Sequence, residues 1–177
     1  MRAGEVEQLE LQALWALEAT PRGPARERAL LCTVGATSFA VPIQYLRAVE
    51  PHARLTPLPH VPPWVLGLTN VRGTVVGVVD LARFLELGET PPGQGRLLIC
   101  GEGPRLVALA VAAARDVLDY PPERARPAEQ LGLRGEPGGG LRGRAGRFLA
   151  GLIQMDSTAV PLLAVGRLLA DEELVSG

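Results

Sequence analysis

The chain has 177 residues, a formal net charge of −1, 47% hydrophobic residues and only 4% aromatic residues. A chain of this length buries roughly 70% of its unfolded surface, so it needs neither a metal nor a disulfide to fold. The near-zero charge disfavours general electrostatic attraction to nucleic acid or to an anionic membrane. No apolar stretch approaches the roughly 20 residues of a membrane span. The first residues, MRAGEVEQLE, carry acids where a signal peptide needs an apolar core, so we expect a cytoplasmic protein.

Residues 5–18 predict an amphipathic helix. Val6, Leu9, Ala13 and Leu17 recur at helical spacing, and the stretch TPRGP at 20–24 ends the pattern. Such an apolar stripe needs a partner surface, either the body of the same chain or another chain. We therefore expect residues 1–28 to hold an amino-terminal helix and a Pro-rich linker.

Beyond residue 28 the sequence predicts a mainly β protein. Short runs of Val, Leu and Ile are separated by Gly, Pro and Asn. The candidate strands are 29–34, 38–42, 46–50, 65–70, 74–79, 96–100, 105–111, 114–119, 148–155 and 159–163. Asp80 is placed to cap a short helix, LARFLEL, that ends at Gly88, and a last helix is expected at about 166–174. Without regular alternation of strands and helices, this order favours small barrels or sandwiches.

The two halves of the chain repeat each other. Residues 64–85 align without a gap to residues 148–169, so that Gly67 matches Gly151 and Arg83 matches Arg167. Upstream, ALLCTVGATSFAVPIQYLRAVE is similar to RLLICGEGPRLVALAVAAARDVLD, with the same order of apolar runs and glycine turn. The second copy has a longer connection, 121–147. This pattern predicts a duplicated small barrel with about five strands and a helix in each copy.

The connection contains GGGLRG at 138–143, which formally satisfies the dinucleotide pattern G-x-G-x-x-G. That fingerprint needs a strand before it and a helix after it, and neither is expected here, so we interpret the segment as a loop, with anion binding as an alternative. An RNA contact is a further alternative, but the segment lacks aromatic residues for stacking. The arginines concerned are Arg134, Arg142, Arg144 and Arg147.

No catalytic or metal-ligating constellation is recognisable. His52 and His60 are eight residues apart, with no Cys or carboxylate at ligand spacing. No serine lies in a nucleophile elbow. Cys32 and Cys100 each stand alone in an apolar run, which predicts buried, reduced thiols. We therefore expect no enzyme activity and no cofactor.

Arg72 lies in the polar stretch Asn70-Val71-Arg72-Gly73, between two strongly apolar runs of GLTNVRGTVVGVVDL. The matching stretch of the second half is QMDS at 154–157, so Arg72 is replaced by Asp156. One interpretation is a solvated turn residue in each half. The other is that the two barrels present different surfaces to different partners.

GLTNVRGTVVGVVDL resembles the G-V-x-N-L-R-G-x-x-V-P-V-V-D-L motif of the chemotaxis coupling protein family, CheW. The resemblance extends over nearly all of 29–170 and includes the Pro-rich stretch LPHVPPWVLG. It implies two packed five-stranded SH3-like barrels that arose by duplication. We expect a CheW-like domain over 29–177, with a first barrel at about 29–88, a second at about 95–170, and the carboxy-terminal helix.

The resemblance also implies a non-enzymatic adaptor. Such proteins bridge the cytoplasmic tip of a methyl-accepting chemoreceptor and the regulatory domain of a CheA-type histidine kinase. The receptor tip would lie in an apolar groove between the barrels. Carried over by position, the expected partner-binding residues are Arg72, Leu46, Leu97, Asn70, Val71 and Gly73.

The sequence departs from the family motif at Ala48, Gly77, Ala112 and Ala164. The family usually has Glu, Pro, Asp and Asp at these positions. A specialised scaffold for pilus-based motility or a related chemosensory pathway is therefore an alternative. A third possibility, from another class, is a small-molecule or nucleic-acid module that uses the connection 121–147.

Overall fold

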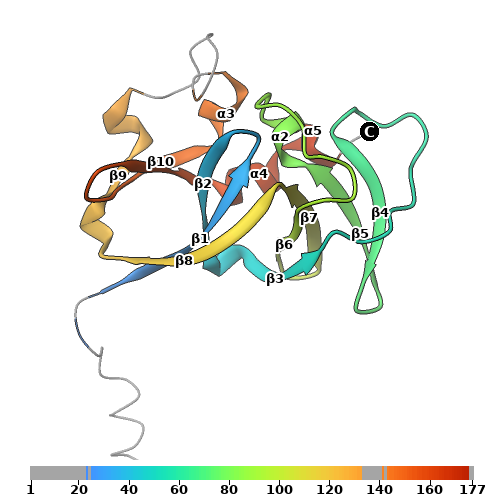
Figure 1. Ribbon diagram of the computed structural model, residues 1–177, viewed down its shortest axis with the longest axis horizontal. Helices are drawn as coiled ribbons and strands as arrows, with labels where there is room; N and C mark the ends of the chain where they lie inside the picture. Colours follow the sequence, from blue (N-terminus) through green and yellow to red (C-terminus); the bar gives the residue numbers. More distant parts are fainter. Residues whose placement is uncertain (1–22, 24, 133–140, 142, 176–177) are drawn as a thin grey trace, which may run out of the picture.

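The computed structural model describes residues 23, 25–132, 141 and 143–175, which form two packed β-sheets with short helices at their ends (Figure 1). The strands are β1 (Glu27–Val34), β2 (Thr37–Pro42), β3 (Leu46–Pro51), β4 (Val65–Val71), β5 (Thr74–Asp80), β6 (Arg96–Glu102), β7 (Arg105–Val111), β8 (Ala113–Tyr120), β9 (Ala125–Pro127), β10 (Leu149–Gln154) and β11 (Ala159–Leu163). The helices are η1 (Ile43–Tyr45), α2 (Leu81–Phe84), η2 (Pro122–Arg124), η3 (Ala128–Leu131), α3 (Arg144–Arg147), α4 (Val165–Ala170) and α5 (Glu172–Val175). The mainly β prediction is confirmed, whereas the helix predicted at 5–18 lies outside the described residues.

The two sheets exchange strands between the sequence halves. Sheet A has the order β8-β1-β2-β11-β10-β9, and sheet B has the order β3-β6-β7-β5-β4. Each sheet therefore takes the first two strands of one half and later strands of the other. The parallel pairs β2–β11 and β5–β7 join the halves. This differs from the expected contiguous barrels at 29–88 and 95–170, because the strand pairs that complete each sheet are remote in sequence.

The duplication is visible in the backbone itself. β4 and β10 each carry a bulge that ends at the matched glycines Gly67 and Gly151. The backbone nitrogen of Asp80 donates to the carbonyl oxygen of Trp64 at 2.7 Å, and the matched nitrogen of Ala164 donates to Phe148 at 2.7 Å. Because these features recur at one constant offset in sequence, the repeat in the sequence is also a repeat in the structure.

The matched arginines of the two halves also bind alike. Arg83 Nη1 donates to the carbonyl oxygen of Pro63 at 3.1 Å, and Arg167 Nη1 donates to that of Arg147 at 3.2 Å. Each guanidinium therefore ties the first turn after a hairpin to the residue two positions before that hairpin. The two arginines therefore have a structural role in the fold.

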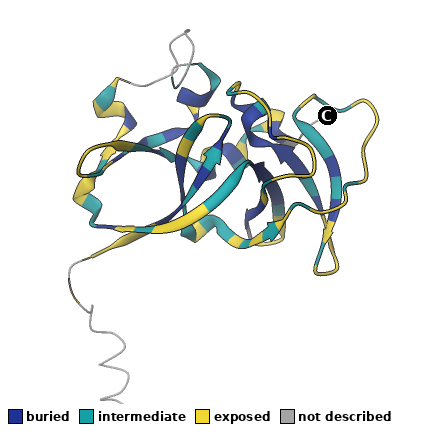
Figure 2. Ribbon diagram, viewed as in Figure 1, coloured by how far each residue is buried: buried dark blue, intermediate teal, exposed yellow. Residues whose placement is uncertain are grey.

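Three buried clusters hold the sheets together. One lies within sheet B and contains Leu97 and Ile99, and a smaller one within sheet A contains Ala29 and Ile153. The third and largest draws residues from both sheets and from the helices, and it fills the middle of the molecule (Figure 2). Central strands such as β6 are consequently apolar on both faces, which explains their continuous apolar runs.

Three elements differ from the predictions. β9 was not expected, since it is only three residues long and contains Pro127. Its counterpart in the first half is the isolated bridge between Thr56 and Leu68. The helix expected at about 166–174 is divided into α4 and α5 at Asp171, and the helix after Asp80 ends at Phe84 instead of running on to Gly88.

Cys32 and Cys100 are buried free thiols, as the sequence predicts. Burial raises the pKa of both thiols from the ordinary 9.0 to about 12, with the neighbouring Cys100 adding to the effect on Cys32. The fold thus favours the neutral thiols, whereas the unfolded chain ionises them above about pH 9.

We therefore expect the free energy of unfolding to fall as the pH rises from about 9 towards 12, because the unfolded state then releases protons that the native state keeps. Urea unfolding followed by circular dichroism across this range would measure the decline. In a Cys32→Val, Cys100→Val double variant the decline should be shallower. Parallel curves for the two proteins would show that the thiols do not contribute.

Candidate partner-binding site

The motif arginine lies at the tip of the β4–β5 hairpin. Val71 pairs with Thr74, so Arg72 and Gly73 form a two-residue loop. Their φ values are +51° and +88°, the sign pattern of a type I′ turn, which matches the twist of a hairpin. Asn70 stabilises the turn, because its Oδ1 accepts a hydrogen bond from the backbone nitrogen of Gly73 at 2.8 Å. The sequence N-V-R-G therefore encodes a rigid turn that presents Arg72.

The side chain of Arg72 is 81% exposed and forms one ion pair. Its Nη2 lies 3.3 Å from Oε1 of Glu50 in β3. β3 and β4 are the two edge strands of sheet B, so this pair joins opposite edges of the curled sheet. Exposed ion pairs of this kind contribute only about 0–1 kcal/mol to stability. The ion pair thus orients the side chain of Arg72 while leaving it exposed to solvent.

The second half reverses the polarity of this pair. Asp156, the counterpart of Arg72, has its Oδ1 3.3 Å from Nη1 of Arg124. Each hairpin tip therefore forms one ion pair, Arg72 with an acid of β3 and Asp156 with a base of η2. The halves thus both have an ion pair at the hairpin tip, but they differ in the charge presented there. This difference supports the interpretation of two different surfaces.

The hairpin extends beyond the body of the molecule, and its tip is exposed (Figures 1 and 2). Val75, just beyond the turn, is 66% exposed, whereas Val71 packs against the cluster within sheet B. Arg72, Gly73 and Val75 thus form one projecting polar and apolar surface, which we call the hairpin tip. Val71 supports it from below.

The two leucines that were expected to bind a partner lie in different environments. Leu46 is half-buried at the start of edge strand β3, beside a bulge in its pairing with β6. Leu97 is 0% exposed and packs in the cluster within sheet B. The expectation that Leu97 faces a partner is therefore corrected. It opens a strand that is covered on both faces, and an apolar residue at that position serves the core.

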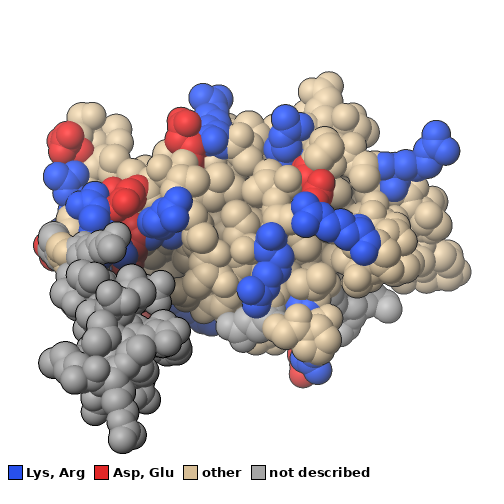
Figure 3. All heavy atoms as spheres, turned by 90° about the horizontal axis from the view of Figure 1, so that it is seen from below, with Lys and Arg blue, Asp and Glu red and all other residues tan. Residues whose placement is uncertain are grey.

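A second exposed feature was not predicted from the sequence. It is an Arg-x-Val pattern that recurs on edge strand β3 of sheet B and on edge strand β8 of sheet A. In β3, Arg47 is exposed and Val49 is 40% exposed, and in β8, Arg115 is exposed and Val117 is 46% exposed. Figure 3, viewed from below, shows basic side chains along the length of this face with acidic ones beside several of them. The signal was present in the repeat, since LRAV and ARDV align.

The comparison with known proteins decides the family. The CheW-like domain matches residues 28–173 of this chain. The chain belongs to the CheW-like family. That match spans both sheets, and the family motif coincides with the β4–β5 hairpin.

Relatives from bacteria agree with this assignment. The chemotaxis protein CheW of Klebsiella aerogenes is 25% identical over 146 residues, which cover 82% of each chain. The protein FrzA of Myxococcus xanthus is 39% identical over 79 residues, which cover 45% of this chain and 49% of FrzA. The crystal structure of the scaffolding protein TtCheW from Thermoanaerobacter tengcongensis aligns with a TM-score of 0.66 at 18% identity, over 81% of this chain and 88% of that chain. The last comparison shows that the CheW fold is shared.

The departures from the CheW motif lie at different depths. Ala48 packs against the cluster within sheet B, where the family has a Glu. At Gly77 a Cβ would meet no atom within 4 Å, so the site has room for a small side chain. Ala164 precedes α4 without any side-chain cap, in contrast to Asp80 before α2. These differences change the surface and the helix ends of this CheW-like protein and leave its core pattern intact.

Within the described part of the chain, no group of three or more His, Cys, Asp or Glu side chains could hold a metal ion. No helix there is long and apolar enough to cross a membrane. The predicted G-x-G-x-x-G loop falls largely outside the described residues.

Proposed function

We propose that this protein is a non-enzymatic, cytoplasmic adaptor that couples chemoreceptors to a CheA-type histidine kinase. The observation that carries the proposal is the exposed, rigidly positioned Arg72 of the CheW motif at the hairpin tip. An arginine that is held by one weak ion pair can exchange Glu50 for a carboxylate of a partner at little cost. Membership of the CheW-like family supports the class of partner.

The proposed surface comprises the hairpin tip and edge strand β3. In this surface Leu46 would be a half-buried apolar contact, and Asn70 and Gly73 would bind through the turn that carries Arg72. Val49 adds an exposed apolar side chain on the outward face of β3, beside Arg47. A helical receptor tip that lies across this strand would meet an apolar centre with arginines at its margin, the usual composition of a helix-binding surface.

Arg72→Glu is expected to weaken binding to the receptor tip or to the kinase regulatory domain by tenfold or more, about 1.4 kcal/mol, while the protein stays folded. The substitution reverses the charge at the surface and places a second carboxylate near Glu50. Pull-down or calorimetric titration with each purified partner would measure the loss.

Asp156→Arg is the matched control, since it reverses the charge at the other hairpin tip, where Arg124 is the partner. Its effect on the affinity for the receptor tip and for the kinase regulatory domain is expected to differ from that of Arg72→Glu. If Arg72→Glu binds both partners as tightly as the unmodified protein does, the hairpin tip is not the site.

A second candidate function is a scaffold in a pathway of pilus-based motility or a related chemosensory output. The observation that favours it is the set of departures from the CheW motif, together with the similarity to FrzA. Titration against receptors and kinases from several gene clusters of one genome would separate the two. Preference for a kinase outside the flagellar cluster would favour this alternative.

A further inference from the structure

One end of the first half is closed by the chain segment that leads into β6. Thr90 is buried there, and its backbone nitrogen and its hydroxyl donate to the two carboxylate oxygens of Asp80, each at 2.9 Å. The hydroxyl also lies 3.4 Å from the carbonyl oxygen of Ala110. Next to it, Arg83 Nη2 donates to Glu89 Oε2 at 2.8 Å. The segment 89–93 thus plugs the space between α2 and β7.

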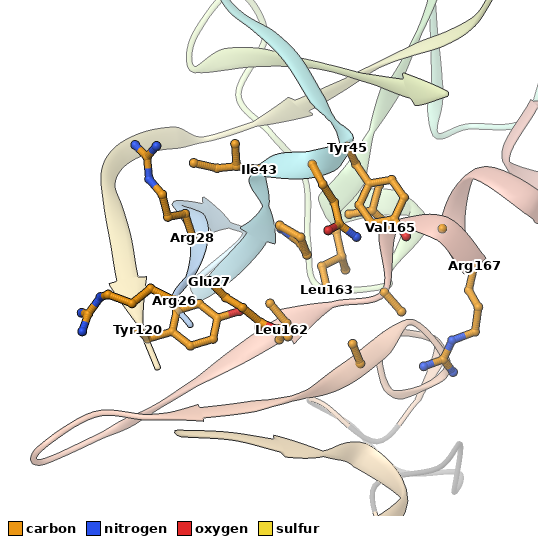
Figure 4. A pocket seen from close by; sticks show the side chains of 15 residues that line it. Arg26, Glu27, Arg28, Ile43, Tyr45, Tyr120, Leu162, Leu163, Val165 and Arg167 are labelled. Carbon is orange, nitrogen blue, oxygen red and sulfur yellow. The ribbon is translucent and has the colours of Figure 1, made fainter. Parts of the chain in front are cut away.

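The equivalent place in the second half is open. The repeat matches Asp80 with Ala164 and Arg83 with Arg167, and the strand register matches Ala110 with Pro42. Ala164, Arg167 and Pro42 all line a hollow of about 740 Å³, which we call the Tyr45–Tyr120 pocket (Figure 4). Since Ala164 offers no carboxylate, nothing equivalent to the Asp80–Thr90 contact can form here.

The pocket has an apolar floor and a mainly basic rim, where Glu27 is the one acid beside Arg26, Arg28 and Arg167 among the described residues that line it. Ile43, Leu162 and Val165 line it, whereas the guanidinium groups of Arg28 and Arg167 extend away from its centre in Figure 4. Its chemistry therefore suits a segment with apolar side chains on one side and carboxylates on the other.

The chain upstream of β1 is the positional counterpart of the plugging segment. Residues 20–23, TPRG, repeat the T-P-x-G of residues 90–93, and Glu18 precedes them much as Glu89 precedes the other. Segment 5–18 adds the predicted apolar stripe, with four glutamates and no basic residue. Arg26 already lines the pocket, so a segment that ends at residue 20 is joined to the pocket by a connection of six residues, which can span roughly 20 Å.

We propose that segment 5–20 of this chain docks in its own Tyr45–Tyr120 pocket. The apolar stripe covers the half-buried Ile43 and Leu162, beneath which Val165 is fully buried, and the glutamates face the exposed Arg28 on the rim. The segment thereby covers the place in the second half whose counterpart in the first half is closed by segment 89–93. This inference is independent of the proposed adaptor function, because the pocket includes none of the hairpin-tip residues.

Trp15 provides the test, because the chain has only one other tryptophan, Trp64. In full-length protein carrying Trp64→Phe, Trp15 is expected to emit at short wavelength and to be several-fold less accessible to acrylamide than in the same protein with Ile43→Asp. The Asp introduces a charge on the pocket floor and repels the glutamates. Val75→Asp, an acid at the exposed hairpin tip, is the matched control and should leave Trp15 protected.

If Ile43→Asp fails to fold, Arg28→Glu on the rim tests the same contact through its charge and should expose Trp15. Equal quenching in the parent and in the pocket variant would overturn the proposal. Protection that disappears on dilution, together with a dimer in light scattering, would also overturn it, since the occupant would then come from a second copy.

Discussion

Gly67→Ala and Gly151→Ala are each expected to lower the free energy of unfolding by about 3–5 kcal/mol, among the largest single-residue effects in this fold. A Cβ at Gly67 would lie 2.2 Å from the carbonyl oxygen of Thr56, and one at Gly151 would lie 2.2 Å from that of Arg126. Both neighbours are backbone atoms, so no side-chain rotation can relieve the clash. Gly67 also has a φ of +136°, which adds strain for any other residue.

Gly77→Ala in neighbouring β5 is the matched control, since a Cβ there would meet no atom within 4 Å. It should change the free energy of unfolding by less than about 1 kcal/mol, because an open strand position tolerates alanine. Urea unfolding of the three variants would compare them directly. Equal stability of Gly67→Ala and Gly77→Ala would mean that the close approach to Thr56 is not maintained in solution.

The elements of this fold could be predicted because each carries a local signal. Ten strands follow from apolar runs between turn residues, and Asp80 marks the start of α2. The duplication could also be predicted from the sequence, since both copies need a glycine where a third segment crosses the β-bulge. Gly67 and Gly151 are invariant between the halves for that physical reason.

The arrangement of those elements could not be predicted from the same signals. Parallel pairing of β2 with β11 and of β5 with β7 depends on contacts between remote segments, and apolar runs do not specify partners. Leu97 illustrates the consequence, because an apolar residue that opens a strand can face either a partner or the core. The ion pair of Arg72 with Glu50 was hidden for the same reason, since it joins two sheet edges 22 residues apart in the chain.

Asp80→Ala is expected to lower the free energy of unfolding by about 4 kcal/mol. Asp80 is fully buried, and its Oδ1 accepts from the backbone nitrogen of Ala82 at 3.1 Å as the cap of α2. Both of its oxygens also accept from Thr90, and Arg83 Nε lies 3.5 Å from Oδ2. The alanine variant would lose the cap and leave the backbone N–H of Thr90 buried without an acceptor, a loss that costs about 1–3 kcal/mol. The Thr90 hydroxyl would keep only its 3.4 Å contact with the carbonyl oxygen of Ala110.

Asp171→Ala is the matched control that separates the loss of a helix cap from the loss of the contacts with Thr90. Asp171 Oδ1 accepts one hydrogen bond, from the backbone nitrogen of Glu173 at 2.9 Å, and it anchors no buried segment. Its replacement should cost only about 1 kcal/mol. Amide hydrogen exchange provides the second readout, because Asp80→Ala should expose the amide of Thr90 while leaving the amides of β10 protected. If Asp80→Ala costs no more than Asp171→Ala, the aspartate of the CheW motif acts only as a helix cap, and the closure of this end of the first half has another cause.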